Sequence, residues 1–468
     1  MAVCEYCSTT LLKDAESVKN IGKVAEVLED YSPIQINTSG LFKGRNFTVV
    51  GRIQLRYEAG FWNEWHILFD DGASGWLSDA SGQYILTVPE QMPQGAVPRF
   101  ETLKPGHVYP YRGSTFFASD VRTAQCVTCQ GELPFRVGGE WEAKVADFRA
   151  GTRFLTLDYS DGDSPQLYLG QAVQLQEMRC QLLRDLDAVS ASSGKFKGKT
   201  VALDCPSCGS PIQYKAGMAF HVICPSCHAE VDCSTDKAEV LQKADEIAQI
   251  TTTLSLGDIG NIDGSKFEAI GLLQCQAGDE EGSSTWVEYL LFNADRGFLW
   301  LVESELGWDR VAVLNQWPNQ QQKNTVELNG EKFDRLEEYD SEVIYAAGAF
   351  NWRASIGDRT RITDFQKGKR KISSEANANE IVWTSSQRVT EEQIGLWFGK
   401  KIASTAMDGA TENVLSKKIP IILSVLVALF NLPISFGSGM RGIKVIFWAL
   451  VILWIPVMII RYFNKQDR

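Results

Sequence analysis

An internal duplication constrains the fold of this chain more than any other sequence feature. Three blocks of glycine, aromatic and acidic residues recur in the same order along the 468 residues. The matching blocks are 44–51 with 264–271, 62–79 with 286–303, and 131–151 with 348–368, at separations of 220, 224 and 217 residues. Collinear matches over about 170 residues, shifted only by short length changes, indicate two homologous units.

Both copies contain short segments rich in β-branched and aromatic residues that end in Gly or Asp turns, a pattern typical of strands and hairpins. Examples are residues 47–57 and 65–72 in copy one, and 286–292 and 298–302 in copy two. The fold class predicted is therefore mainly β, with one small barrel or sandwich in each of the domains 29–180 and 236–400. Helices are predicted in the connectors, at 15–28, 172–187, 238–250 and 390–406.

Two near-identical Cys-Pro-Ser-Cys knuckles lie between the copies, within a predicted domain at 200–235. Cys205 and Cys208 form the first knuckle, and Cys224 and Cys227 form the second. Each turn brings two thiolates to one side of a tight loop, and two such turns supply the four sulfurs of a closed tetrahedral Zn²⁺ site. The spacing predicts a structural zinc ribbon, with the nearby His228 and Cys233 as bystanders.

The N-terminal segment 1–28 carries half of a second ribbon followed by a predicted helix. Cys4 and Cys7 correspond to the second knuckle of the complete ribbon at the 220-residue separation, and two thiolates alone do not close a tetrahedral site. Three arrangements would complete it: a first knuckle encoded before Met1, the pair Cys126 and Cys129, or a second molecule. Cys126 and Cys129 have no cysteine counterpart in copy two.

The last fifty residues differ from the rest, which the mean hydropathy of -0.14 conceals. Two uncharged apolar runs, 419–434 and 445–460, are joined by a short Gly/Ser loop. Each is shorter than the roughly 20 residues that span a bilayer comfortably, but flanking basic and aromatic side chains favour a transmembrane helical hairpin at 417–463. More Lys and Arg lie outside the hairpin than within its loop, so both termini and the β domains are predicted on the cytoplasmic face of a cell inner membrane. The alternative is a buried hairpin in a soluble core.

The charge and cysteine content narrow the range of functions. The formal charge is -12, which argues against binding nucleic acid through a basic surface. Eleven cysteines without a secretory signal favour a reducing compartment, where paired thiols hold metal more often than they form disulfides. The chain contains no P-loop, Gly-x-Ser-x-Gly or His-Glu-x-x-His motif.

The recurring residues resemble a known family. The Gly-x-x-Phe-x-x-x-Gly block, Trp62-Asn-Glu-Trp65, Gly75-Trp-Leu and the 131–135 block are similar to those of bacterial proteins that carry domain of unknown function 4178, usually together with zinc-ribbon knuckles. The resemblance covers most of residues 1–400 and implies no activity. It implies a partner protein in a bacterial membrane-stress or polyamine-linked system.

Aromatic and acidic residues of the β domains are the binding candidates. They are Trp62, Glu64, Trp65, Trp76, Trp286, Glu288, Tyr289 and Trp300. Carboxylates also recur at Asp147 and Asp364. Glu64, which stands between Trp residues, is interpreted as a turn residue or as a cross-strand partner in the sheet. Packing in the core also explains the aromatic residues. No catalytic residue is assigned.

The sequence predicts a non-enzymatic, membrane-anchored scaffold or recognition protein with structural Zn²⁺, which contacts lipid through its hairpin and binds protein partners. The alternative is a membrane-tethered enzyme or a polyamine binder, in which Glu64, Asp70 and Asp71 face an aromatic cage. The basic run 367–371 is interpreted as a solvated hairpin tip, or as a contact to anionic lipid.

Overall fold

The structure is a computed structural model. It describes residues 32–402 with gaps at 59, 81, 94–96, 136–140, 186–202, 213–220, 234–238, 243–249, 279–283, 294–295 and 323. It also describes the backbone of three N-terminal strands, β1 (Ala2–Val3), β2 (Thr9–Lys13) and β3 (Val18–Lys23).

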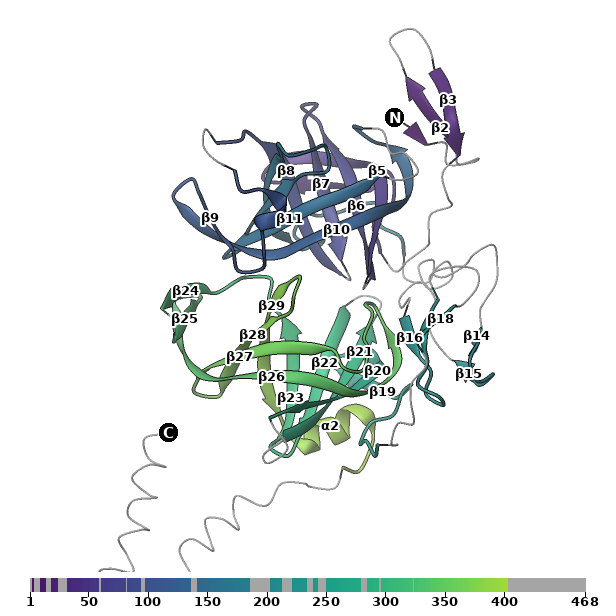
Figure 1. The fold of residues 1–468 in the computed structure, drawn as a ribbon, viewed down its shortest axis with the longest axis vertical. Helices are drawn as coiled ribbons and strands as arrows, with labels where there is room; N and C mark the ends of the chain where they lie inside the picture. Colours follow the sequence, from purple (N-terminus) through teal and green to yellow (C-terminus); the bar gives the residue numbers. More distant parts are fainter. Residues whose placement is uncertain are drawn as a thin grey trace, which may run out of the picture. The chain divides into compact units, whose positions relative to one another are not determined.

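Copy one is a closed antiparallel barrel, here called barrel one (Figure 1). Among the described residues, eight strands form the ring. In ring order they are β5 (Arg45–Tyr57), β6 (Gly60–Phe69), β7 (Ser74–Ala80), β8 (Gln83–Glu90), β13 (Gln166–Val173), β12 (Arg153–Asp158), β11 (Glu142–Ala150) and β10 (Ser114–Glu132). The strands β4 (Ser39–Phe42) and β9 (Val108–Tyr111) extend β5 and β10, and a short 3-10 helix, η1, covers Phe100–Thr102.

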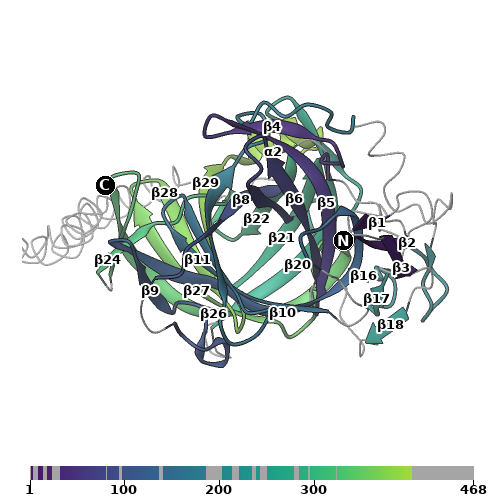
Figure 2. The same ribbon diagram turned by 90° about the horizontal axis from the view of Figure 1, so that it is seen from above.

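Copy two repeats this ring as barrel two, as Figure 2 shows from above for the strands of both copies. Its eight described ring strands are β20 (Ser265–Ala277), β21 (Ser284–Asn293), β22 (Gly297–Ser304), β23 (Gly307–Val313), β29 (Ile381–Val389), β28 (Arg370–Ala376), β27 (Arg359–Lys367) and β26 (Glu331–Phe350). The flanking strands are β19 (Ile259–Ile262), β24 (Asn319–Gln322) and β25 (Thr325–Leu328). The prediction of a mainly β fold with two homologous β units is confirmed.

Glycines allow each ring to close. In barrel one β5 pairs with β10 at Gly51 and Gly131, and in barrel two β20 pairs with β26 at Gly271 and Gly348. A Cβ at Gly131 would lie 2.3 Å from the Val50 carbonyl oxygen, and a Cβ at Gly348 would lie at the same distance from the Ile270 oxygen. The recurring glycines are therefore positions where two strands approach too closely for any side chain.

The predicted helices are mostly wrong. The segment 15–28 contains strand β3, the segment 172–187 has turns after β13 in its described part, and 238–250 begins with strand β18 (Glu239–Gln242). Neighbouring strands override local helical periodicity here, since β3 pairs with β2 and β18 pairs with β17 (Glu230–Asp232). Within the described residues, only the helix predicted at 390–406 is present, as α2 (Glu391–Phe398).

Both ends of α2 follow from its sequence. The Thr390 side chain accepts from the Gln393 backbone N–H, and the Gln393 side chain accepts from the Thr390 N–H, which forms a capping box. Gly399 ends the helix in the left-handed region with φ of 65°. No helix within the described ranges is long and apolar enough to cross a bilayer, and the predicted hairpin at 417–463 lies outside those ranges.

Candidate metal centre and barrel interiors

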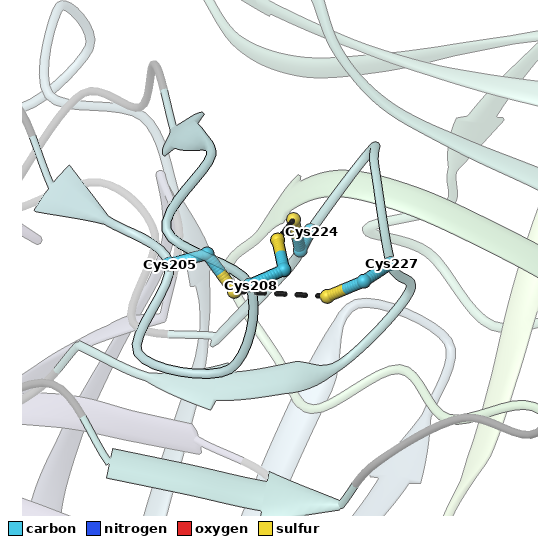
Figure 3. Close-up of side chains that lie close together, drawn as sticks. All are labelled: Cys205, Cys208, Cys224 and Cys227. Carbon is cyan, nitrogen blue, oxygen red and sulfur yellow. Dashed lines mark hydrogen bonds between the residues drawn. The ribbon is translucent and has the colours of Figure 1, made fainter.

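The four predicted zinc ligands converge in one cluster. Cys205 and Cys208 lie between β14 (Leu203–Asp204) and β15 (Pro211–Ile212), while Cys224 and Cys227 lie between β16 (His221–Ile223) and β17. Figure 3 shows the four sulfur atoms turned toward one another. The Cys205 and Cys227 Sγ atoms are 3.7 Å apart, those of Cys208 and Cys224 are 3.8 Å apart, and all four lie within 4.8 Å of one another. Sulfurs at about 2.3 Å from a tetrahedral Zn²⁺ are separated by about 3.8 Å, so the cluster fits zinc.

The two knuckles have the same backbone hydrogen bonds. The Gly209 N–H donates to the Cys205 carbonyl and the His228 N–H to the Cys224 carbonyl, both at 2.8 Å. Gly209 and His228 both adopt positive φ, at 74° and 53°, which turns the chain back so that both thiols of a knuckle face the same side. His228 is therefore a turn residue, and its Nδ1 contacts the Ala346 carbonyl oxygen instead of the thiol cluster.

The cluster has one exposed and two buried thiols. Hydrogen bonds involving Ser210 lower the pKa of Cys208 to about 6, whereas burial raises the pKa of Cys224. A bound dication offsets the cost of a buried thiolate, because metal coordination deprotonates thiols outright. Four thiolates around a bound ion would complete a tetrahedral shell and leave no position for a reactive water, so the cluster could hold a metal ion in a closed site.

The ribbon is joined to barrel two by strand pairing. Strand β16 continues the sheet of β26, with His221 opposite Phe350 and Ile223 opposite Gly348. The side chain of Ile223 is buried in the apolar cluster of barrel two, next to Ile270 and Phe350. The backbone of β1 pairs with β10 in the same way, at Gly131 and Glu132. The repeat therefore includes the strand that enters each second knuckle.

The cysteine pair that has no counterpart in copy two lies inside barrel one. Cys126 and Cys129 belong to an apolar cluster with Ile53 and Leu55, and burial raises their thiol pKa values to about 12 and about 11. Cys4 and Cys7 lie outside the described residues. How the N-terminal half site is completed stays a prediction.

Glu64 lies on the inner face of barrel one. Its Oε1 accepts from Trp62 Nε1 at 2.8 Å, and Ser78 Oγ on the neighbouring strand donates to Oε2 at 2.7 Å. Trp62, Glu64 and Ser78 share one face of the sheet, while Trp65 alternates to the other face and is 1% exposed. Glu64 is thus a cross-strand partner of Ser78 within the sheet.

Carboxylates from the far side of the ring meet Glu64 across the interior. Asp147 on β11 and Asp158 on β12 lie at least three strands from β6 around the ring, yet both raise the pKa of Glu64 electrostatically. Burial is the larger cause and raises that pKa to about 8, and it raises the pKa of Asp147 to about 6. The Thr156 hydroxyl donates to Asp147 Oδ1 at 2.6 Å.

Barrel two contains the same arrangement of acids. Glu288 accepts from Trp286 Nε1 at 2.7 Å, as Glu64 does from Trp62. Asp364 accepts from Ser373 at 2.6 Å, and Glu375 accepts from Thr384 at 2.8 Å. Burial, followed by the Glu288 charge, raises the pKa of Glu375 to about 7. The acids that recur in the sequence are thus brought together inside each barrel.

Sequence comparison missed one member of each acid set. Asp158 and Glu375 stand 217 residues apart, at the separation already seen for Asp147 and Asp364. Different acid types at the two positions concealed the match, although the preceding Thr156 and Ser373 donate to the acid of the neighbouring strand in both copies.

The interior acids give the chain a specific pH dependence. We expect stability to fall as the pH rises from about 5 to about 8, because Glu64 and Glu375 keep protons in the folded chain that they release when unfolded. Each such proton contributes up to about 1.4 kcal/mol per pH unit. Glu64→Gln together with Glu375→Gln should flatten the dependence of the denaturation midpoint on pH. The exposed Glu305→Gln is the control, and an unchanged slope in the double variant would contradict the assignment.

Of the remaining candidates, Trp76 and Trp300 lie on the inner faces of the barrels, while Trp65 and Tyr289 lie on the outer faces. Trp65 is buried beneath the Arg52 guanidinium, and Tyr289 is buried against Trp308, with its hydroxyl donating to Glu303 at 2.6 Å. Trp300 packs against Trp352 near Trp286 in the inner cluster of barrel two. These side chains support the folded barrels.

The turn after β6 contains Asp70 and Asp71, which bond Asn46 and Arg45 at 2.8 and 2.7 Å and lie away from the aromatic groups near Glu64. The basic run 367–371 forms the β27–β28 turn, as predicted. Lys367 and Arg370 pair there with Glu331, which leaves less charge for anionic lipid.

The comparisons with known proteins place both barrels in one family. The family model of a domain of unknown function, DUF4178, matches residues 35–175 and 255–391, which together are more than half of the chain. The chain belongs to the DUF4178 family. The two matches coincide with barrel one and barrel two, so the DUF4178 domain of this chain is an eight-stranded barrel in tandem copies. No curated protein and no solved structure matches the chain.

Proposed function

We propose that the chain is a non-enzymatic recognition protein, in which tandem DUF4178 barrels bind partners and a structural zinc ribbon stabilises the second barrel. The observation that supports it best is the four-thiol cluster, whose sulfur spacing fits a closed site. Strand β16 connects this cluster directly to β26, so zinc binding contributes to the folding of barrel two.

The barrels provide the surface for recognition. Their inner faces combine tryptophans with acids, while the described residues outside the ribbon include no other group of His, Cys, Asp or Glu with metal-ligand spacing. A role at the cytoplasmic face of a cell inner membrane, in a membrane-stress or polyamine-linked system, is the wider setting that we propose. It is supported by the apolar runs 419–434 and 445–460 and by their flanking charges.

Truncation tests the membrane anchor. We expect the full chain to sediment with membranes and to resist extraction at high pH, because two apolar helices bury their surface in lipid. A variant ending at residue 402 should appear in the soluble fraction with its zinc content unchanged. The matched control replaces residues 403–416 with a Gly/Ser linker and keeps the hairpin, and it should remain in the membrane. Sedimentation of the truncated variant with membranes would contradict a C-terminal anchor.

A further inference from the structure

The inner faces of the two barrels share their acids and tryptophans but differ in their cationic groups. In barrel two, Lys371 Nζ lies 3.1 Å from Asp364 Oδ2, so an ammonium of the chain itself neutralises this acid. Phe154 occupies the position of Lys371 in barrel one, and Asp147 there has no ion pair within 4 Å among the described residues. The charged group nearest in sequence is Arg149, whose guanidinium lies over the Phe154 ring. The Arg149 and Arg122 guanidinium groups lower the pKa of Asp147 electrostatically from beyond ion-pair distance, and Arg122 itself pairs with Asp120. Among the described residues of barrel one, Glu64, Asp147 and Asp158 therefore lack the direct ion pair that Lys371 makes in barrel two.

His66 adds an unsatisfied acceptor to the same interior. The side chain is 7% exposed, and its Nδ1 lies 3.0 Å from the Glu132 carbonyl oxygen. A carbonyl only accepts, so Nδ1 carries the proton and the neutral ring presents the Nε2 lone pair. Nε2 is buried without a hydrogen-bond partner, and His66 lies on the same face of β6 as Glu64. Buried polar atoms in native proteins are nearly always paired, so this acceptor points to a donor outside the chain.

The inner face of barrel one is also more exposed to solvent than the outer face. Trp62, Glu64 and Trp76 keep part of their surface exposed, whereas Trp65 and Leu77 on the outer face are 1% and 0% exposed. Small barrels usually fill their interior with side chains and leave the outer face to solvent. The reverse distribution here indicates that the tryptophans and acids of the interior border space that side chains do not fill.

We propose that barrel one binds a small organic monocation with a flat apolar body, such as an aromatic amidinium or a primary ammonium joined to an aromatic ring by a short alkyl chain. Its N–H donors bond Glu64 and His66 Nε2, and its ring packs against Trp62 and Trp76. Asp147 and Asp158 complete the negative charge around the cation. This inference rests on the proposed recognition role and assigns a ligand class to one of the two barrels.

Cation binding is linked to proton release. Burial and the facing Asp147 and Asp158 favour the protonated form of Glu64, while Ser78 and Trp62 donate to its ionised form. Burial lowers the pKa of the facing His66, and the charges of Arg149, Arg122 and Asp120 also face Asp147. The bound cation requires the carboxylate, so affinity should rise up to about tenfold per pH unit until about pH 8. The ligand must stay charged throughout this pH range, so that a change in affinity reflects the titration of Glu64 and not that of the ligand.

Calorimetry on the full chain tests the proposal with benzamidine and 2-phenylethylamine as cations and benzamide as the neutral isostere of benzamidine. We expect both cations to bind at least tenfold more tightly than benzamide, and to release protons at pH 7 when buffers of different ionisation enthalpy are compared. Glu64→Gln, which keeps an oxygen for Trp62 and Ser78, should weaken cation binding at least tenfold. His66→Leu introduces the residue that barrel two has at this position, Leu290, and should weaken it less.

Glu288→Gln is the matched control in barrel two and should leave cation binding unchanged. Equal binding of benzamide and the cations, equal losses in the two Gln variants, or no binding of either cation would overturn the proposal. Zinc content and membrane location are measured on the same samples. Unchanged values of both, together with absent cation binding, would reject only the ligand, whereas their loss would reject the proposed function itself.

Discussion

Cys224→Ser should remove zinc from the chain and detach the ribbon from barrel two. The serine hydroxyl is a poor zinc ligand, and the remaining three thiolates lie around a site that needs four. Binding energies of structural zinc sites are on the order of 10 kcal/mol, and this energy is available only to the folded ribbon. We expect metal analysis to fall from one zinc per chain to background, and amide exchange to accelerate in β16 and in the segment of β26 that pairs with it.

Cys233→Ser is the matched control for this result. Cys233 lies in the same apolar cluster as Cys205 and Cys224 and is 9% exposed, but its sulfur is not one of the four that converge. The variant should keep one zinc per chain and native exchange rates in β16. If Cys224→Ser retained its zinc, the four-thiol site would be wrong. If both variants lost zinc, the effect would reflect damage to the apolar cluster.

Gly131→Ala should be among the most destabilising single substitutions in barrel one. Gly131 has φ of 70°, and a Cβ there would lie 2.3 Å from the Val50 carbonyl oxygen and 3.1 Å from Gly51 Cα. Both contacts are to backbone, so they are relieved only if β5 and β10 separate where the ring closes. We expect a loss of about 3 kcal/mol or more in the free energy of unfolding, measured by chemical denaturation.

Gly151→Ala distinguishes the cost of the close approach of two strands from the cost of the left-handed backbone conformation. Gly151 has φ of 61°, and a Cβ there would meet no atom within 4 Å beyond its chain neighbours, so only the left-handed conformation is penalised, at about 1–2 kcal/mol. Barrel two offers the same pair at Gly348 and Gly368, with φ of 98° and 60°. Equal losses at Gly131 and Gly151 would show that ring closure does not depend on the missing side chain.

Sequence patterns predicted the elements that local chemistry determines. The four-thiol cluster followed from the spacing of Cys205, Cys208, Cys224 and Cys227, and the strands followed from alternating β-branched and aromatic residues. The repeat was visible because glycines such as Gly131 and Gly348 are required in both copies by the same close approach of strands. The sequence left a barrel and a sandwich open as alternatives, because ring closure depends on the pairing of β5 with β10, which joins segments far apart in the chain.

The interior acids show why part of the site was not predicted. From the sequence of β6 alone, Glu64 cannot be distinguished from an ordinary strand residue. Its role as an interior acid becomes visible only in the folded ring, where β11 and β12 bring Asp147 and Asp158 to face it. The helices at 15–28 and 172–187 were wrong for a related reason. Their residues follow a helical pattern locally, but β2 pairs with β3, and Leu175 and Met178 pack into the apolar cluster around Trp65.

X-ray absorption at the zinc edge tests the central claim most directly, which is that the metal is structural and the chain does not use it for chemistry. The four converging thiols predict one zinc per chain with four sulfur ligands at about 2.3 Å and no lighter ligand. A shell with three or fewer sulfurs and an oxygen or nitrogen ligand would show an open coordination position. That result would contradict the structural role and favour a catalytic metal.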